Sequence, residues 1–115
     1  MSSGGILWST FSGSPFIQSL SNGERITILN VTQQGVFVQG DAAIATLAID
    51  PIASEPKDGT IIHIMGMDDT NYVVIPVSDT DGGYVGNGDI YLKKYDTATI
   101  VYNASIKRYT ELGRS

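Results

Sequence analysis

Residues 60–77 read TIIHIMGMDDTNYVVIPV, which is two runs rich in β-branched residues on either side of a short polar segment. Val, Ile and Tyr favour strands, whereas Gly and Asp favour the turn that joins two strands. The stretch therefore predicts a strand over 60–65, a turn over 66–70 and a second strand over 71–77. Pro76 cannot donate to a strand ladder, so the second strand is expected at an edge.

Both strands carry apolar side chains on their two faces, although a strand with one buried face alternates apolar and polar residues. A small domain has one core, so the second face must meet something else. We expect it to meet other copies of the chain, because a symmetric homo-oligomer is the simplest arrangement that buries such a face. The residues expected at this subunit interface are Ile61, His63, Met65, Tyr72 and Val74.

Similar short runs continue along the chain. They cover residues 25–31, 35–39, 44–49, 89–92, 98–102 and 106–112, with a polar, Gly-rich loop over 78–88. Turn residues separate the runs, and none of them has helical periodicity. The pattern predicts an all-β fold, a small antiparallel β-sandwich or barrel, over residues 24–115.

The first 23 residues contain no charged side chain, and seven of them are Ser and four are Gly. Large apolar side chains are costly to leave in water. We interpret residues 1–23 as an extended N-terminal arm whose apolar side chains bind another protein. The expected anchors are Ile6, Leu7, Trp8, Phe11, Phe16, Ile17 and Leu20. The alternative is an ordinary first strand packed on its own domain.

Composition narrows the classes of partner. The 115 residues include 7 basic and 12 acidic side chains, a net charge of −5. Phosphate binding needs a basic face, so we expect no nucleic acid as partner. No run of about 18 apolar residues occurs, so we expect no membrane span. The chain has no Cys, and its start lacks the features of a signal peptide, which favours folding in a cytoplasm.

Few residues could carry chemistry. His63 is the only histidine and falls within an expected strand, so we expect no catalytic triad, no enzymatic activity and no cofactor. Asp79, Asp81 and Asp89 surround a loop that partly matches a calcium-binding loop, but the spaced third ligand and the terminal Glu are missing. We therefore expect no metal, with calcium at these aspartates as the alternative.

Tyrosines concentrate in the last third of the chain, at positions 84, 91, 95, 102 and 109. Tyr102 and Tyr109 belong to the expected final hairpin, where a cross-strand aromatic pair would stabilise the sheet. The alternative role for these rings is a stacking surface for a sugar or for a partner protein.

Three segments resemble the small β domains of tailed-phage virion proteins. Residues 58–64, DGTIIHI, resemble the Asp-Gly-Thr turn of those domains and the apolar strand after it. Residues 96–102, DTATIVY, resemble their strand GDTITFVY, and residues 106–115, IKRYTELGRS, resemble their closing sequence KWYELSRS. The likeness covers about half of the chain, from residue 58 to residue 115.

Such domains occur in tail fibres, head fibres and capsid decoration proteins, commonly as trimers. The resemblance implies a structural virion protein, made in the host cytoplasm and carried on the capsid surface. We expect a capsid cement (decoration) protein, in which a homotrimeric β domain and its arms bind the major capsid protein and stabilise the head. A start at Met1 with only a short arm favours this role over a fibre. The alternative is the receptor-binding knob of a tail or head fibre, which contacts host-surface glycan.

Overall fold

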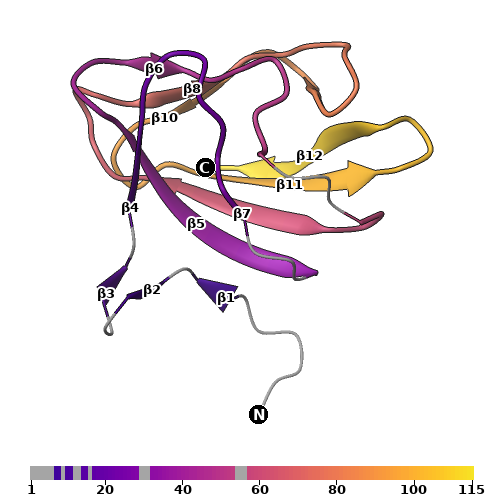
Figure 1. Ribbon diagram of the computed structural model, residues 1–115, viewed down its shortest axis with the longest axis horizontal. Coiled ribbons are helices and arrows are strands. Elements are labelled where there is room, and N and C mark those ends of the chain that lie inside the picture. Colours follow the sequence, from indigo (N-terminus) through magenta and orange to yellow (C-terminus); the bar gives the residue numbers. More distant parts are fainter. Residues whose placement is uncertain (1–6, 9, 12–13, 16, 29–31, 54–56) are drawn as a thin grey trace.

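The computed structural model describes residues 7–8, 10–11, 14–15, 17–28, 32–53 and 57–115, and for residues 7–15 it describes the backbone only. These ranges form strands, turns and irregular segments, with no helix among them (Figure 1). The predicted all-β class is confirmed. No helix in the described ranges could cross a membrane.

The larger of the two main layers is a curled sheet of seven strands. The strands are β1 (Leu7–Trp8), β4 (Ile17–Leu20), β5 (Gln33–Gly40), β7 (Ile61–Gly66), β9 (Tyr84–Val85), β11 (Thr97–Asn103) and β12 (Arg108–Arg114). Their order is β1-β5-β7-β11-β12-β9, and β4 also pairs with β5. One edge of β5 pairs with β7. The other edge of β5 pairs first with β1 and then with β4, which lie one after the other along it.

Strand pairing in this sheet is mixed, whereas the sequence suggested antiparallel pairing. β11 is antiparallel to both β7 and β12, but β5 is parallel to β4 and β7, and β9 is parallel to β12. Parallel neighbours need a long connection that returns the chain to its starting end. The segments between β4 and β5 and between β5 and β7 are long enough to do this. Evenly spaced strands in the sequence therefore did not mean that each strand forms a hairpin with the next.

A second, three-stranded sheet lies above the first in Figure 1. It consists of β6 (Ala45–Thr46), β8 (Val73–Ile75) and β10 (Ile90–Leu92), in the order β10-β8-β6. β2 (Thr10–Phe11) and β3 (Ser14–Pro15) form a separate antiparallel pair near the N-terminus. Isolated bridges join Ile26 to Ile52 and Val77 to Tyr84.

The core lies between the inner faces of the two sheets. β7 shows how it is built, because Ile62 and Ile64 are fully buried while their neighbours on the strand are partly exposed. The buried apolar cluster consists of Leu20, Ile26, Val36, Val38, Ala45, Leu47, Ile52, Ile62, Ile64, Val73, Ile75, Tyr84, Ile90, Leu92, Ala98, Ile100 and Tyr109. The architecture is that of a small sandwich closed towards a barrel.

Several expected strands are shorter than predicted. Residues 71–77 contain only β8, which ends before Pro76, and residues 44–49 contain only β6. Of the expected strand over 25–31, residues 29–31 lie outside the described residues, and Ile26 makes an isolated bridge. β9, in contrast, forms inside the segment expected to be a loop.

The expected arm over 1–23 does not extend to its predicted end as a free segment. β4 pairs with four residues of β5, from Ile17 with Phe37 to Leu20 with Gly40. For these four residues the structure supports the alternative interpretation, a strand packed on its own domain. Leu7 and Trp8 of β1 also pair with β5, so among the described residues before Ile17 only β2 and β3 lie off the large sheet.

Candidate functional site

The face of the large sheet that points away from the core is the strongest candidate for a contact surface. We call it the outer face. It is formed by alternate residues of β5, β7 and β11, namely Gln33, Phe37, Ile61, His63, Met65, Thr97, Thr99 and Val101. All eight side chains are partly exposed in the single chain. Gly35, the β5 residue opposite His63, is buried, so the partly exposed positions of β5 lie on either side of it.

Strand register places the apolar members of the outer face in two rows. Ile61 lies between Gln33 and Val101, at one end of the face. Met65 lies between Phe37 and Thr97 at the other end, and β4 extends this row with Ile17, which is 37% exposed. A partner on the outer face would thus make apolar contacts at both ends of the face, and the polar row that contains His63 lies between these ends.

His63 is held by two neighbouring strands. Its Nε2 lies 3.1 Å from the Gln33 Nε2, and its Nδ1 lies 3.1 Å from the Thr99 hydroxyl oxygen. The Gln33 amide nitrogen can only donate, so in this arrangement His63 Nε2 accepts and Nδ1–H donates to Thr99. Burial lowers the pKa of His63, which favours the same neutral form. His63 thus links β7 to β5 through Gln33 and to β11 through Thr99.

The five expected interface residues do not share one surface. Ile61, His63 and Met65 lie on the outer face of β7. Tyr72 and Val74 lie on the far side of the small sheet, where the Tyr72 ring contacts Tyr91 edge-on with centroids 6.3 Å apart. Val74 is already buried, at 6% exposure. One symmetric interface formed by the outer face would therefore leave Tyr72 and Val74 outside it.

The expected arm anchors divide into three groups. Leu20 is wrong as an anchor, because its side chain is 5% exposed and belongs to the core cluster. Ile17 is partly exposed at the edge of the outer face. Ile6 and Phe16 lie outside the described residues, and the side chains of Leu7, Trp8 and Phe11 are likewise not described.

The aspartates of the possible calcium loop are engaged elsewhere. Arg108 Nε donates to Asp79 at 3.1 Å, and its Nη1 donates to Asp81 at 2.8 Å. Asp89 accepts a hydrogen bond from the backbone N–H of Val77. A guanidinium group thus takes the place that a cation would need between Asp79 and Asp81. Among the described residues, no group of three His, Asp or Glu side chains is arranged to hold a metal ion.

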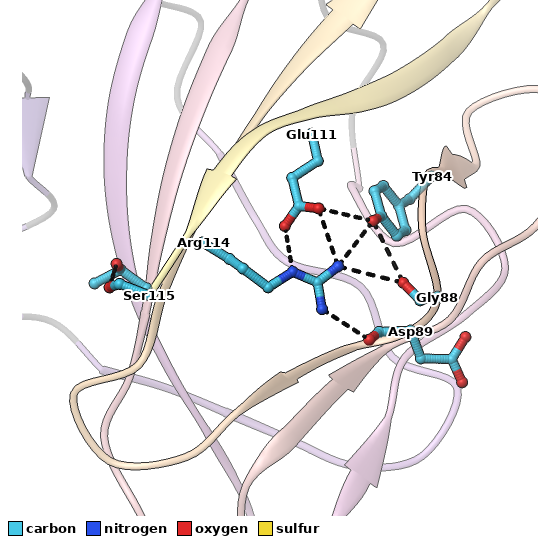
Figure 2. Close-up of polar contacts among 7 residues, drawn as sticks. Tyr84, Gly88, Asp89, Glu111, Arg114 and Ser115 are labelled. Atoms are coloured by element: carbon cyan, nitrogen blue, oxygen red, sulfur yellow. Dashed lines mark hydrogen bonds and ion pairs between the residues drawn. The ribbon is translucent and has the colours of Figure 1, made fainter.

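A second arginine fastens the segment after β9 to β12 (Figure 2). Arg114 binds Glu111 through two nitrogens at 2.6 and 3.0 Å, and also donates to the Tyr84 hydroxyl at 3.2 Å. Its Nη1 and Nη2 reach the backbone carbonyls of Asp89 and Gly88. Burial, followed by the Glu111 charge, raises the pKa of Tyr84. These groups form one hydrogen-bonded network that ties the segment after β9 to β12.

Sequence reasoning missed the parts played by Arg108 and Arg114. Both residues fall within the closing segment that resembles phage virion domains, and Glu111 completes the second cluster. An arginine that follows an acidic loop in the sequence indicates that an ion pair is possible. The sequence does not indicate which acidic residue it pairs with, because the partners lie far apart along the chain. The cross-strand pair of Tyr102 and Tyr109 was predicted, and it is confirmed, with ring centroids 5.1 Å apart.

Comparison with known proteins adds no relative. No protein family model, curated protein or solved structure matches this chain.

Proposed function

We propose that this chain is a non-enzymatic structural protein of a virion, a capsid decoration protein that assembles as a homotrimer and binds the major capsid protein. The observation that carries the proposal is the two-sided apolar character of β7. Ile62 and Ile64 are fully buried in the core, while Ile61 and Met65 are partly exposed on the opposite face. A central strand that is apolar on both faces is typical of a chain that assembles with other copies.

An assembly through the outer face would need a contact of ordinary interface size. A standard interface buries about 800 Å² per partner. That is roughly an eighth of the 6266 Å² accessible surface of the chain. Each apolar side chain that becomes fully buried contributes about 1.5–3 kcal/mol at most, against an association cost of about 4–15 kcal/mol. Ile61 and Met65 are therefore too few alone, and Val101 and Ile17, which lie in the same two rows, must take part.

Capsid attachment is assigned to the segment before Ile17, in which, among the described residues, only the two residues of β1 pair with the domain's own large sheet. This segment has no charged side chain and contains Trp8, Phe11 and Phe16. In a trimer three such segments are linked, so a weak contact by each gives strong binding through effective concentration. Adhesion of many copies would stabilise the head, and no catalytic group is needed for it.

The oligomer is tested by native mass spectrometry of the whole chain and of an Ile61→Asp, Met65→Asp double variant. We expect a trimer of 12.3 kDa subunits for the parent chain and a folded monomer for the double variant. The matched control is Ile49→Asp, at an exposed loop position, which should remain trimeric. A monomeric parent chain at micromolar concentration would contradict the trimer.

Capsid binding is tested by deleting residues 1–16 and sedimenting the truncated protein with undecorated capsids built from the major capsid protein of the same virus. We expect a folded trimer that stays in the supernatant, whereas the full chain pellets with the capsids. Sedimentation of the truncated protein at full occupancy would contradict the assignment of attachment to this segment. Failure of the full chain to bind would contradict the decoration function itself.

A further inference from the structure

Four glycines follow an Asn or an Asp in the sequence, and all four have a left-handed backbone conformation, with φ between 80° and 99°. An Asn or Asp before Gly is open to attack on its side-chain carbonyl by the next backbone nitrogen, because glycine has no Cβ to hinder the approach. The four pairs are Asn22-Gly23, Asp58-Gly59, Asp81-Gly82 and Asn87-Gly88.

In three of these pairs the fold occupies the attacking nitrogen. The glycine N–H donates a hydrogen bond to a backbone carbonyl of a distant segment, which holds the nitrogen away from the neighbouring side chain. The donors and acceptors are Gly23 and Thr46 at 2.9 Å, Gly59 and Tyr102 at 2.8 Å, and Gly82 and Lys107 at 2.8 Å.

The side chain that would be attacked is also held in these three pairs. Each Oδ1 accepts a hydrogen bond from the same distant segment or from a residue next to it. The acceptors and donors are Asn22 and the Thr46 N–H at 2.9 Å, Asp58 and the Ala104 N–H at 2.8 Å, and Asp81 and Arg108 Nη1 at 2.8 Å. Both reacting groups are therefore fixed, and two hydrogen bonds must open before they can meet.

The fourth pair, Asn87-Gly88, has neither restraint. No described residue forms a hydrogen bond with the Asn87 side-chain amide or with the Gly88 N–H. Both residues are exposed, and nothing lies within 4 Å of a Cβ placed at Gly88. The chain is fastened directly after the pair, where the Gly88 carbonyl accepts from the Tyr84 hydroxyl and from Arg114, each at 3.4 Å (Figure 2).

We propose that Asn87 is a site of spontaneous deamidation in the folded chain, and that Asn22 is protected by its hydrogen bonds. The Gly88 backbone nitrogen loses its proton to solvent and attacks Cγ of Asn87. The new N–Cγ bond closes a five-membered succinimide, the Cγ–Nδ2 bond breaks, and the side-chain nitrogen leaves as ammonia. Water then opens the ring at one of its two carbonyls, which gives either aspartate or isoaspartate at position 87.

The products differ from the parent chain in charge and in backbone length. Either product adds one carboxylate to a chain whose net charge is −5. Isoaspartate also carries the backbone through its side chain, which inserts one methylene group before Gly88. Arg114 binds the carbonyls of Gly88 and Asp89 directly after this position. The reaction therefore changes the segment that Arg114 fastens to β12.

The test is incubation of the folded chain in mildly alkaline buffer, followed by tryptic digestion at mildly acidic pH, where new deamidation is slow. Trypsin releases Asn22 and Asn87 in separate peptides, residues 1–25 and 58–93. Fragment-ion mass spectrometry then places the exchange of NH₂ for OH. We expect Asn87 to convert at least about 10-fold faster than Asn22, because two hydrogen bonds hold the Asn22-Gly23 pair.

Two controls separate the fold from the local sequence. Asn87→Gln cannot close a five-membered ring, so this variant should lose the fast conversion and the acidic form that anion exchange resolves. In concentrated urea the parent chain should convert at Asn22 and at Asn87 at similar rates, because the hydrogen bonds of Asn22-Gly23 are then absent.

Three results would overturn the proposal. One is an Asn87 amide that persists in the folded chain while the unfolded chain reacts. The second is equal conversion of Asn22 and Asn87 in the folded chain. The third is a rate difference that persists in urea, which would assign it to the local sequence. The outcome is independent of the trimer and capsid experiments, because neither the outer face nor residues 1–16 take part.

Discussion

Two buried tyrosines stand opposite one another in β9 and β12, and their hydroxyls have opposite surroundings. Tyr84 and Tyr109 are register partners. The Tyr84 hydroxyl contacts Glu111, Arg114 and the Gly88 carbonyl, whereas the Tyr109 hydroxyl has no partner among the described residues. Burial raises the pKa of Tyr109 far above the usual value for a tyrosine, so both rings stay neutral in ordinary buffers.

The same substitution should therefore have opposite effects at the two positions. Tyr84→Phe loses hydrogen bonds and should lower the free energy of unfolding by about 1 kcal/mol. Tyr109→Phe removes an unsatisfied group and should raise the free energy of unfolding by about 1–2 kcal/mol. Urea unfolding of both variants measures the difference. Equal destabilisation by the two changes would mean that the Tyr109 hydroxyl has a partner in the folded chain.

His63 predicts how stability depends on pH. Burial lowers its pKa in the folded chain, so the unfolded chain binds more protons as the pH falls below about 6.5. The free energy of unfolding should therefore decrease between about pH 7 and about pH 5. Asp68, whose pKa is lowered mainly by the backbone N–H groups of Asn71 and Thr70, acts only at more acidic pH.

Thermal unfolding across this pH range checks the prediction. The parent chain should lose melting temperature as the solution becomes mildly acidic, and His63→Gln should lose less, since it has no titrating group at this position. An identical pH profile for both proteins would mean that His63 does not control stability in this range.

At the scale of elements, β4 connects the expected arm to the core. Leu20 is 5% exposed and Ile17, on the same strand, is 37% exposed. Leu20→Ala should cost about 2–5 kcal/mol of unfolding free energy, whereas Ile17→Ala should cost less than about 1 kcal/mol. Chemical denaturation distinguishes them. A small effect of Leu20→Ala would show that β4 leaves the sheet easily and behaves as part of the arm.

The end of β7 needs a residue without a side chain. A Cβ at Gly66 would overlap the carbonyl oxygens of Leu92 and Lys93, where the chain passes from β10 towards β11. Gly66→Ala should therefore cost about 3 kcal/mol, because two backbones must move apart. Gly113 is the control, since nothing lies within 4 Å of a Cβ placed there. Similar melting temperatures for the two alanine variants would contradict this close approach.

Prediction from sequence worked best where local pattern and burial agree. The β-branched run over residues 60–65 identified β7, and the tyrosines of the last hairpin identified its cross-strand pair. The pattern could not reveal that β5 lies parallel to β7, because pairing depends on the path of the intervening chain. Nor could it show that Leu20 turns inward, since the uncharged stretch IQSL over Ile17–Leu20 suits an arm and an edge strand equally well.

At the scale of the whole molecule, the outer face has consequences for association. None of its eight side chains carries a formal charge when His63 is neutral. Contacts between such faces are driven by burial of apolar surface, and salt screens only charges. The proposed trimer should therefore persist when the ionic strength is raised from about 0.1 M to about 1 M. Sedimentation velocity measures this, and dissociation by salt would indicate an interface built on ion pairs elsewhere.

The candidate contact surfaces were harder to predict from the sequence than the fold class was. The outer face was anticipated through Ile61, His63 and Met65, but Tyr72 and Val74 were grouped with them only because neighbouring strands were assumed to share one layer. Arg25, Asp81 and Lys107 line one pocket. The sequence did not indicate this pocket, because the three residues come from separate segments of the chain. Only the folded chain brings them together around Tyr109.

The brevity of the outermost strands has a consequence for how this protein behaves at high concentration. One border of the large sheet is β9, with two residues, and the other is shared by β1 and β4, with two and four. Short borders offer few unpaired N–H and C=O groups to a neighbouring molecule. Growth by strand addition, which leads to open-ended fibrils, is thereby discouraged.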